Sequence, residues 1–201
     1  MSEPGGAGGR RAHPLTRRVA LSGAALGLLP AAMGAALAQP APQPSPDRMQ
    51  RPRKGDVLVF ANGAQAGAPV APDALVEGGP QALAWACDPA TKAVRDGSRL
   101  NQVLLVRLAP GSLAEISRAR AADGVVAYSA VCSHAQCPVS DWRKESGILH
   151  CPCHNSEYDP RDNAKVVNGP ATRALASLPI RIDGGVLVVA EPFIGKVGNQ
   201  A

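Results

Sequence analysis

The chain has 201 residues, which is enough for one domain and a tail, and its hydrophobic content of 45% can supply a core. Aromatic residues make up only 3%, so Val, Leu, Ile and Ala must fill that core. The formal net charge of +5 comes largely from arginines near the N-terminus, and no basic stripe with interleaved aromatic residues follows. This pattern excludes nucleic-acid binding. Five cysteines are too few for a disulfide scaffold.

Residues 1–38 are predicted to be an export signal or a membrane anchor. Arg17 and Arg18 precede an uncharged stretch, Val19–Ala38, which resembles a twin-arginine signal although Ala20 and Ser22 depart from its usual pattern. The stretch is about 20 residues long, which is enough to span a bilayer. Residues 36–38 (Ala-Leu-Ala) also form a small-residue cleavage site. The sequence leaves cleavage and retention open and slightly favours membrane association.

Residues 39–54 are predicted to be a linker. Five prolines disfavour a helix there and favour extended polyproline geometry. A passive spacer and a tether that lets a head group move between redox partners require the same composition, so both interpretations stay open.

Residues 55–201 are predicted to form the folded domain. Short β-branched runs predict strands at 56–60, 102–108, 124–130 and 148–150, and a closing hairpin at 179–182 and 185–190 around Asp183 and Gly184. Residues 61–79 and 88–99 have the composition of loops, 82–86 are ambiguous, and 113–122 form a short helix or an exposed loop. Many short strands without a long amphipathic helix predict an all-β fold.

Two short runs hold four of the five cysteines: Cys132-Ser-His134-Ala-Gln-Cys137 (box one) and Cys151-Pro-Cys153-His154 (box two). Two thiolates and two imidazoles from these runs suit a tetrahedral zinc site. They suit equally a [2Fe–2S] cluster with two Cys ligands on one iron and two His ligands on the other. Cys137 and Cys153 occupy the same relative place in the two runs, and a zinc site has no use for this second pair.

The two boxes resemble the cluster-binding motifs of Rieske iron–sulfur proteins, Cys-x-His-x-x-Cys and Cys-x-Cys-His. By this resemblance Cys132 and Cys151 bind one iron of a [2Fe–2S] cluster, and His134 and His154 bind the other. The resemblance further implies a disulfide between Cys137 and Cys153, which would hold the two loops together. It covers roughly residues 125–189 and is highly specific.

The resemblance also implies groups around the cluster. Ser156 and Tyr158 lie where high-potential Rieske proteins place hydroxyl donors to the cluster sulfurs, and Gly169-Pro170 resembles their proline loop. The implied fold is a base of antiparallel sheets with a small cluster-binding subdomain at about residues 128–173. Trp142 is interpreted as a packing residue, Cys87 as a small buried hydrophobic residue, and His13 and His150 are given no role.

Charge explains why two histidines raise the reduction potential. Two ferric ions, two sulfides and two thiolates sum to zero, whereas four thiolates give a net negative cluster that accepts an electron less readily. Donors to sulfur stabilise the reduced cluster further. We therefore expect a potential in the upper part of the Rieske range, which runs from about −150 to +300 mV.

Two departures from the family pattern bear on which redox partner the protein uses. Cytochrome bc-type proteins have Leu and Gly where this chain has Ala135 and Gln136, and Gly where it has Asn155. The Leu and Gly residues form the tip that docks at the quinol site, so their replacement counts against quinol oxidation but not against the cluster. Residues 126–129 and 157–159 also resemble the small subunit of arsenite oxidase.

The main prediction is an electron-transfer subunit of a ubiquinol–cytochrome c reductase type complex, on the periplasmic side of a bacterial inner membrane or in the periplasm after cleavage. It would not be a catalyst alone, and its partners would be cytochrome b and c-type proteins, with quinol as a candidate reductant. The first alternative is a Rieske subunit that serves a molybdenum enzyme of the arsenite oxidase type. A Rieske ferredoxin, a structural zinc module and a Cys–His hydrolase are less consistent with the boxes.

Overall fold

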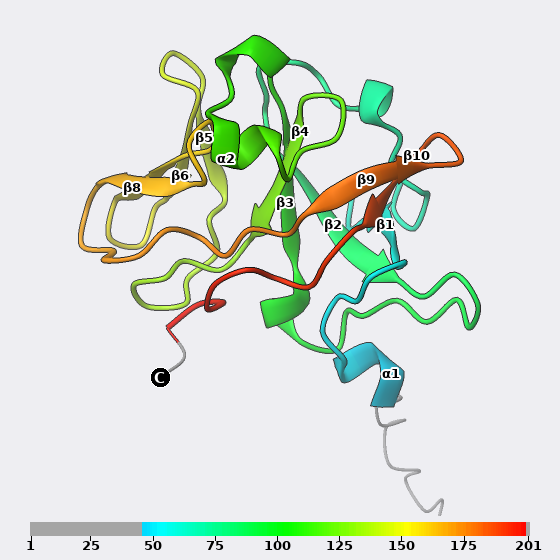
Figure 1. Cartoon of the computed structure of the whole chain (residues 1–201). Helices are drawn as coiled ribbons and strands as arrows, with labels where there is room; N and C mark the ends of the chain where they lie inside the picture. The colour runs from blue at the N-terminus through cyan, green and yellow to red at the C-terminus, as the bar shows by residue number, and fades with distance from the viewer. Residues whose placement is uncertain (1–45, 200–201) are drawn as a thin grey trace, which may run out of the picture. The chain divides into compact units, whose positions relative to one another are not determined.

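The computed structural model describes residues 46–199, which form ten short strands and a few helical turns (Figure 1). The strands are β1 (Val57–Phe60), β2 (Ala82–Cys87), β3 (Val103–Arg107), β4 (Val125–Ser129), β5 (Asp141–Arg143), β6 (Ile148–Cys151), β7 (Ser156–Asp159), β8 (Lys165–Asn168), β9 (Ile180–Asp183) and β10 (Val186–Val189). The helices are α1 (Pro46–Met49) and α2 (Glu115–Arg118), with 3₁₀ turns at Pro72–Ala74, Arg99–Asn101 and Pro110–Ser112. The prediction of an all-β fold is confirmed.

The larger sheet has six antiparallel strands in the order β4-β3-β2-β1-β10-β9. The predicted strands at 56–60, 102–108 and 124–130 correspond to β1, β3 and β4, and the ambiguous segment 82–86 is β2. The predicted closing hairpin is β9–β10. Its two-residue turn is Gly184-Gly185, one residue later than expected, because both turn positions have positive φ (+56° and +82°), which glycine adopts without strain.

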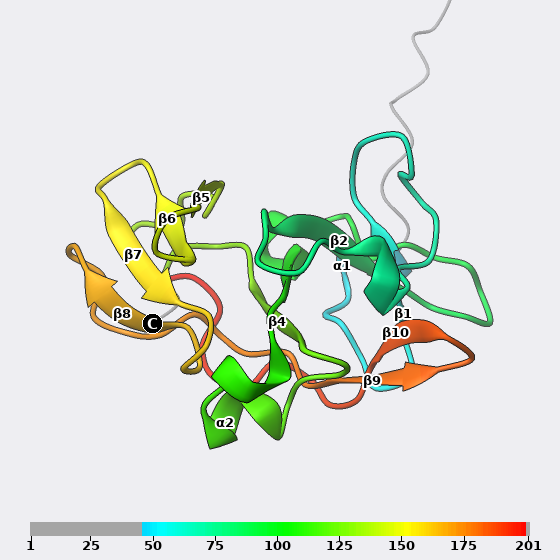
Figure 2. The ribbon, with the colours of Figure 1, turned by 90° about the horizontal axis from the view of Figure 1, so that it is seen from above.

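The smaller sheet has four antiparallel strands in the order β5-β6-β7-β8 and lies beside the larger one (Figure 2). Of these strands only β6 was predicted. β5 and β8 are short and most of their residues are exposed, Val167 of β8 included, so they lack the alternating buried apolar pattern of a half-buried strand. Their pairing with β6 and β7 makes them strands.

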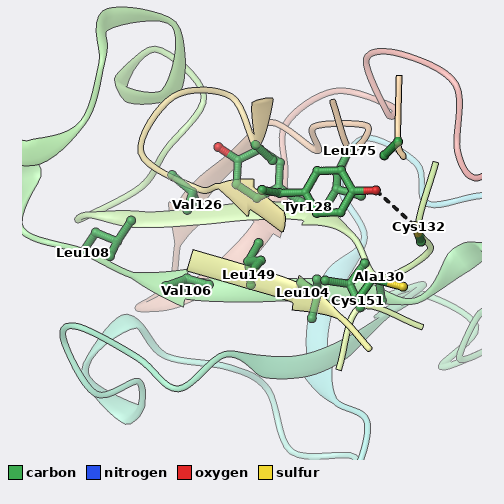
Figure 3. Close-up of a cluster of buried hydrophobic side chains, with 14 of the residues drawn as sticks. Leu104, Val106, Leu108, Val126, Tyr128, Ala130, Cys132, Leu149, Cys151 and Leu175 are labelled. Atoms are coloured by element: carbon green, nitrogen blue, oxygen red, sulfur yellow. Dashed lines mark hydrogen bonds between the residues drawn. The ribbon is translucent and has the colours of Figure 1, made fainter. Parts of the chain in front are cut away.

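The core divides at β3 and β4, because alternate residues of a strand point to opposite faces of the sheet. Leu104 and Val106 pack with Leu149 and Tyr158 of the smaller sheet, whereas Val103 and Leu105 pack against residues of the larger sheet. Figure 3 shows the first of these cores, where side chains of β3, β4 and β6 converge. Cys132 and Cys151 belong to this core, so the two sheets position both thiols.

The N-terminal end of the described chain is held by the loop before β3. Arg95, only 1% exposed, bonds the Asp56 carboxylate through two nitrogens and also contacts the carbonyl oxygen of Asp47. Although the prolines predicted extended chain, Pro46–Met49 forms one helical turn, since proline is favoured at the first position of a helix.

The predicted signal or anchor, residues 1–38, lies outside the described residues, and so does the linker up to residue 45. Within residues 46–199, no helix combines the length and the apolar character needed to cross a membrane.

Candidate metal centre

The two sheets present box one and box two on neighbouring loops. Box one follows β4, and its ends are joined by a hydrogen bond from the Cys132 N–H to the Cys137 carbonyl, 2.8 Å long. Box two is the loop of the β6–β7 hairpin, in which Cys151 pairs with Ser156 across the strands. Cys137 and Cys153 form a disulfide, so a covalent bond links the two loops.

The thiols of Cys132 and Cys151 are free and buried, and each lies near enough to shift the pKa of the other. Burial works to raise the pKa of Cys132, but hydrogen bonds from the Tyr158 hydroxyl and from the His134 backbone outweigh it, so this pKa lies below its usual value. Burial raises the pKa of Cys151, which carries fewer compensating bonds.

The imidazoles of His134 and His154 meet edge to face, with ring centroids 4.8 Å apart. Nδ1 of His134 is buried and has no hydrogen-bond partner among the described residues, so its lone pair is available to a metal. His154 is exposed. Two buried thiols beside two imidazoles, one with an orphaned nitrogen, fit the ligand requirement of a Rieske-type [2Fe–2S] cluster.

A second grouping of thiols is excluded as a metal site. The sulfur atoms of Cys137, Cys151 and Cys153 lie within 4.8 Å of one another. Two of these sulfurs are joined in the disulfide, which leaves Cys151 as the only thiol of the three.

Tyr158, which the resemblance implies to be a donor to the cluster, lies against box one. Its side chain is fully buried, and its hydroxyl lies 3.1 Å from the sulfur of Cys132 and 3.2 Å from the hydroxyl of Ser133. The hydroxyl also accepts the backbone N–H of Ser133 at 3.3 Å. Ser133 itself had no predicted role, although it lies between two predicted ligands in the sequence.

Ser156 and the Gly169-Pro170 segment lie beside box two. The Ser156 hydroxyl is fully buried and accepts the N–H of Ala171 at 3.2 Å, which keeps its own proton free to donate. Gly169 has φ +87°, and a methyl group there would lie 2.5 Å from the carbonyl oxygen of Asn155. The segment that resembles a proline loop therefore packs directly on the backbone of box two.

The two positions where this chain lacks the family glycines keep a glycine-like backbone. Gln136 has φ +59° and Asn155 has φ +60°, both in the left-handed region. Asparagine tolerates this region better than most residues, whereas glutamine is strained there. The departures therefore change the side chains that the loops present, not the left-handed turns themselves.

The remaining candidates were not predicted to be ligands. Trp142 packs so closely on Gly79 that any larger residue there would collide with its indole ring, as expected for a packing residue. Cys87 is only half-buried. His150, which was given no role, is 3% exposed and contacts Asp141, Arg143 and Asn155.

Comparison with known proteins agrees with this geometry. Residues 85–179 match the family model of the Rieske [2Fe–2S] domain. Over 106 residues (52% of this chain, 47% of the relative) the chain is 42% identical to a Haloferax mediterranei protein provisionally named a respiratory nitrate reductase Rieske subunit. Over 104 residues (49% of this chain, 24% of the relative) it is 39% identical to the cytochrome bc1 complex Rieske iron–sulfur subunit of Mycobacterium tuberculosis.

Among solved structures, the plasma membrane Rieske protein of the cyanobacterium Synechocystis matches with a TM-score of 0.35 and 24% identity, over 53% of this chain and 84% of that one. The match spans only about a quarter to a half of the two curated relatives. The chain thus contains a Rieske [2Fe–2S] domain at residues 85–179, and the cofactor of this domain is a Rieske [2Fe–2S] cluster.

Proposed function

We propose that this chain transfers electrons through a [2Fe–2S] cluster held by Cys132 and Cys151 on one iron and by His134 and His154 on the other. The observation that carries the proposal is the meeting of two buried free thiols and two imidazoles on loops that one disulfide joins. When bound, such a cluster takes up and releases one electron.

The surrounding residues determine how the electron is held and passed. Burial of the thiols keeps water from the sulfur side, whereas the exposed His154 gives a partner its shortest approach. The hydroxyl of Tyr158 is placed to donate to the sulfur of Cys132 and so to favour the reduced state. We expect a midpoint potential in the upper part of the range of about −150 to +300 mV.

The proposed physiological role is that of the iron–sulfur subunit of a respiratory complex of the ubiquinol–cytochrome c reductase type, with cytochrome b and c-type partners. Its support is the similarity to bc1 Rieske subunits and the twin-arginine-like segment at Arg17 and Arg18. The proposed location is the periplasmic face of a bacterial inner membrane.

A second role has its own support at the tip of the domain. The small, exposed Ala135 replaces the family leucine, and exposed Asn155 replaces a glycine, so the surface near His154 is less apolar than a quinol-site tip. The name of the Haloferax relative is also that of a nitrate reductase subunit. The second candidate is therefore a Rieske subunit serving a molybdenum enzyme of the arsenite oxidase type.

Two measurements test the proposal. A redox titration of the full chain, followed by electron paramagnetic resonance, should give a Rieske-type signal with a potential well above zero; a colourless protein that contains zinc would contradict the proposed cluster ligands. Affinity purification of the tagged chain from native membranes should then co-purify haem with b- and c-type spectra. Recovery of molybdenum without haem would favour the second role.

A further inference from the structure

His150 is a buried polar side chain directly behind box two. It is the third residue of β6, between Leu149 and Cys151, both of which belong to the core between the sheets. Because side chains alternate along a strand, His150 projects from the other face of the hairpin, where Asp141 and Glu157 are its partners on the neighbouring strands. A polar side chain that is 3% exposed requires partners, and those of His150 lie on β5 and at the residue that follows box two.

The imidazole of His150 reaches the residue that follows His154. Its Nε2 lies 3.2 Å from Oδ1 of Asn155 and 3.1 Å from Nη2 of Arg143, and its Nδ1 lies 3.4 Å from Oδ2 of Asp141. Asp141 and Arg143 both belong to β5, the edge strand next to β6. The Oδ1 atom of Asn155 can only accept, so this contact is a hydrogen bond when Nε2 carries a proton, and Arg143 then lies beside the ring without donating to Nε2. Two residues of β5 therefore flank the ring, which reaches the β6–β7 loop through Nε2.

The contact bears on the turn because the Asn155 backbone is in the left-handed region, at φ +60°, which asparagine adopts more readily than most residues but less freely than glycine. A residue with a Cβ atom is disfavoured there relative to glycine. The backbone of Asn155 also packs closely against Gly169, where an added methyl group would lie 2.5 Å from the Asn155 carbonyl oxygen. The Asn155 side chain thus contacts His150, and the Asn155 backbone packs against Gly169.

We propose that His150 is a positioning residue for the metal centre: it holds the Asn155 side chain, stabilises the left-handed turn after His154, and so fixes the direction of the His154 imidazole. The inference rests on the proposed function, since it takes His154 as a cluster ligand. It also explains how this chain keeps the box-two turn without the glycine that Rieske proteins usually have there. His150 and Asn155 together replace that glycine.

The test is a double-mutant cycle on the full chain with its cluster. The measured quantities are the rate of cluster loss at fixed temperature, followed by visible absorbance, and the electron paramagnetic resonance spectrum of the reduced form. His150→Leu alone should accelerate cluster loss on the order of fivefold and shift the spectrum, because Asn155 loses its restraint. In an Asn155→Gly background the same substitution should accelerate loss by less than about twofold, because glycine adopts the turn freely.

Asn163→Gly is the matched control. Asn163 also has a positive φ, +52°, but it lies in the β7–β8 turn and contacts Arg120 rather than His150. The full effect of His150→Leu should persist in that background. His150→Gln, which keeps a polar group able to reach Asn155, should retain most of the stability of the cluster.

Equal effects of His150→Leu in the original and Asn155→Gly backgrounds would overturn the proposal. If His150→Leu fails to accumulate, recovery by Asn155→Gly would support the proposal, whereas failure of both variants would show that His150 serves the fold independently of Asn155. These outcomes are separate from the proposed function. That function fails if the unmodified chain binds no [2Fe–2S] cluster.

Discussion

The hydroxyl of Tyr158 lies 3.1 Å from the sulfur of Cys132. Because it already accepts the N–H of Ser133, its own proton is free to point at the sulfur or at the Ser133 hydroxyl, 3.2 Å away. As a cluster ligand, Cys132 would be a thiolate with no proton to donate, so the tyrosine would be the donor. In the proposed centre, Tyr158 would therefore connect the core between the sheets to the electronic properties of the cluster.

Replacing Tyr158 by Phe should lower the midpoint potential while the cluster stays bound. The lost hydrogen bond is worth about 1 kcal/mol more to the reduced than to the oxidised state, which corresponds to about 40 mV for a one-electron couple. A redox titration of the variant measures this shift. An unchanged potential would remove Tyr158 from the groups that tune the cluster.

Tyr128→Phe is the control for that variant. Tyr128 is also buried, but its hydroxyl donates to the carbonyl of Pro160, 2.8 Å away. The Tyr128 hydroxyl also lies 3.4 Å from the Ser117 hydroxyl. Its loss should lower the free energy of unfolding by about 1–2 kcal/mol, because a buried carbonyl loses its donor. The midpoint potential should not move.

Ser133→Ala should shift the potential in the opposite direction. The Ser133 hydroxyl donates to the Arg173 carbonyl at 2.6 Å, so it can only accept the proton of Tyr158 and thus competes with Cys132 for it. Removing the competitor should raise the potential in the native background and leave it unchanged in a Tyr158→Phe background. If Ser133→Ala still raised the midpoint potential in the Tyr158→Phe background, Ser133 and Cys132 would not be competing for the Tyr158 proton.

Replacing both disulfide cysteines by serine should destabilise the protein without removing the cluster ligands. The bond joins residues 16 positions apart, and closing a loop of that length stabilises the folded state by about 3 kcal/mol. Denaturation of the Cys137→Ser/Cys153→Ser variant, compared with Cys87→Ser at the free, half-buried cysteine, measures this difference. Complete absence of iron from the double variant after anaerobic preparation would contradict the ligand assignment.

Arg95→Met should lower the free energy of unfolding by about 3–5 kcal/mol, because it leaves the Asp56 carboxylate buried without its partner. Asp56 is 3% exposed, and Arg95 bonds both of its oxygens, at 2.6 and 2.9 Å. The exposed pair Arg48–Asp96 supplies the control, and Arg48→Met should cost far less because water screens it. If Arg95→Met and Arg48→Met lowered the free energy of unfolding by the same amount, the buried ion pair would contribute no more to stability than the exposed one.

The candidate ligands and the cofactor could be inferred from the sequence, because the motifs that carry them are local. Each box places its Cys and His residues within a few positions of one another, and Ser156 and Tyr158 follow box two directly. His150 and Ser133 were missed for a different reason. Their importance comes from contacts with Asn155 and Tyr158 that strand pairing creates, and neither residue has a spacing that signals it.

The strands, like the site, could be predicted where the signal lies in the local sequence and not where it comes from tertiary contacts. β1, β3, β4 and β10 are short runs rich in β-branched and other apolar residues, and turn residues mark the β9–β10 hairpin, so local sequence predicts them. The edge strands β5 and β8 are short and mostly exposed, and only pairing with their neighbours makes them strands. The buried pair of Arg95 and Asp56 joins residues 39 positions apart, and no local pattern indicates that an arginine in a turn-rich segment will be buried.

The most direct test of the proposed centre is electron–nuclear double resonance on the reduced full chain, together with iron and sulfide analysis. The ligand assignment predicts two irons and two sulfides per chain and hyperfine couplings from two histidine nitrogens. One of these couplings should be lost, or the cluster should not form, in His154→Ala. A cluster without nitrogen couplings, or a colourless chain that contains one zinc ion, would contradict the assignment of His134 and His154 as ligands.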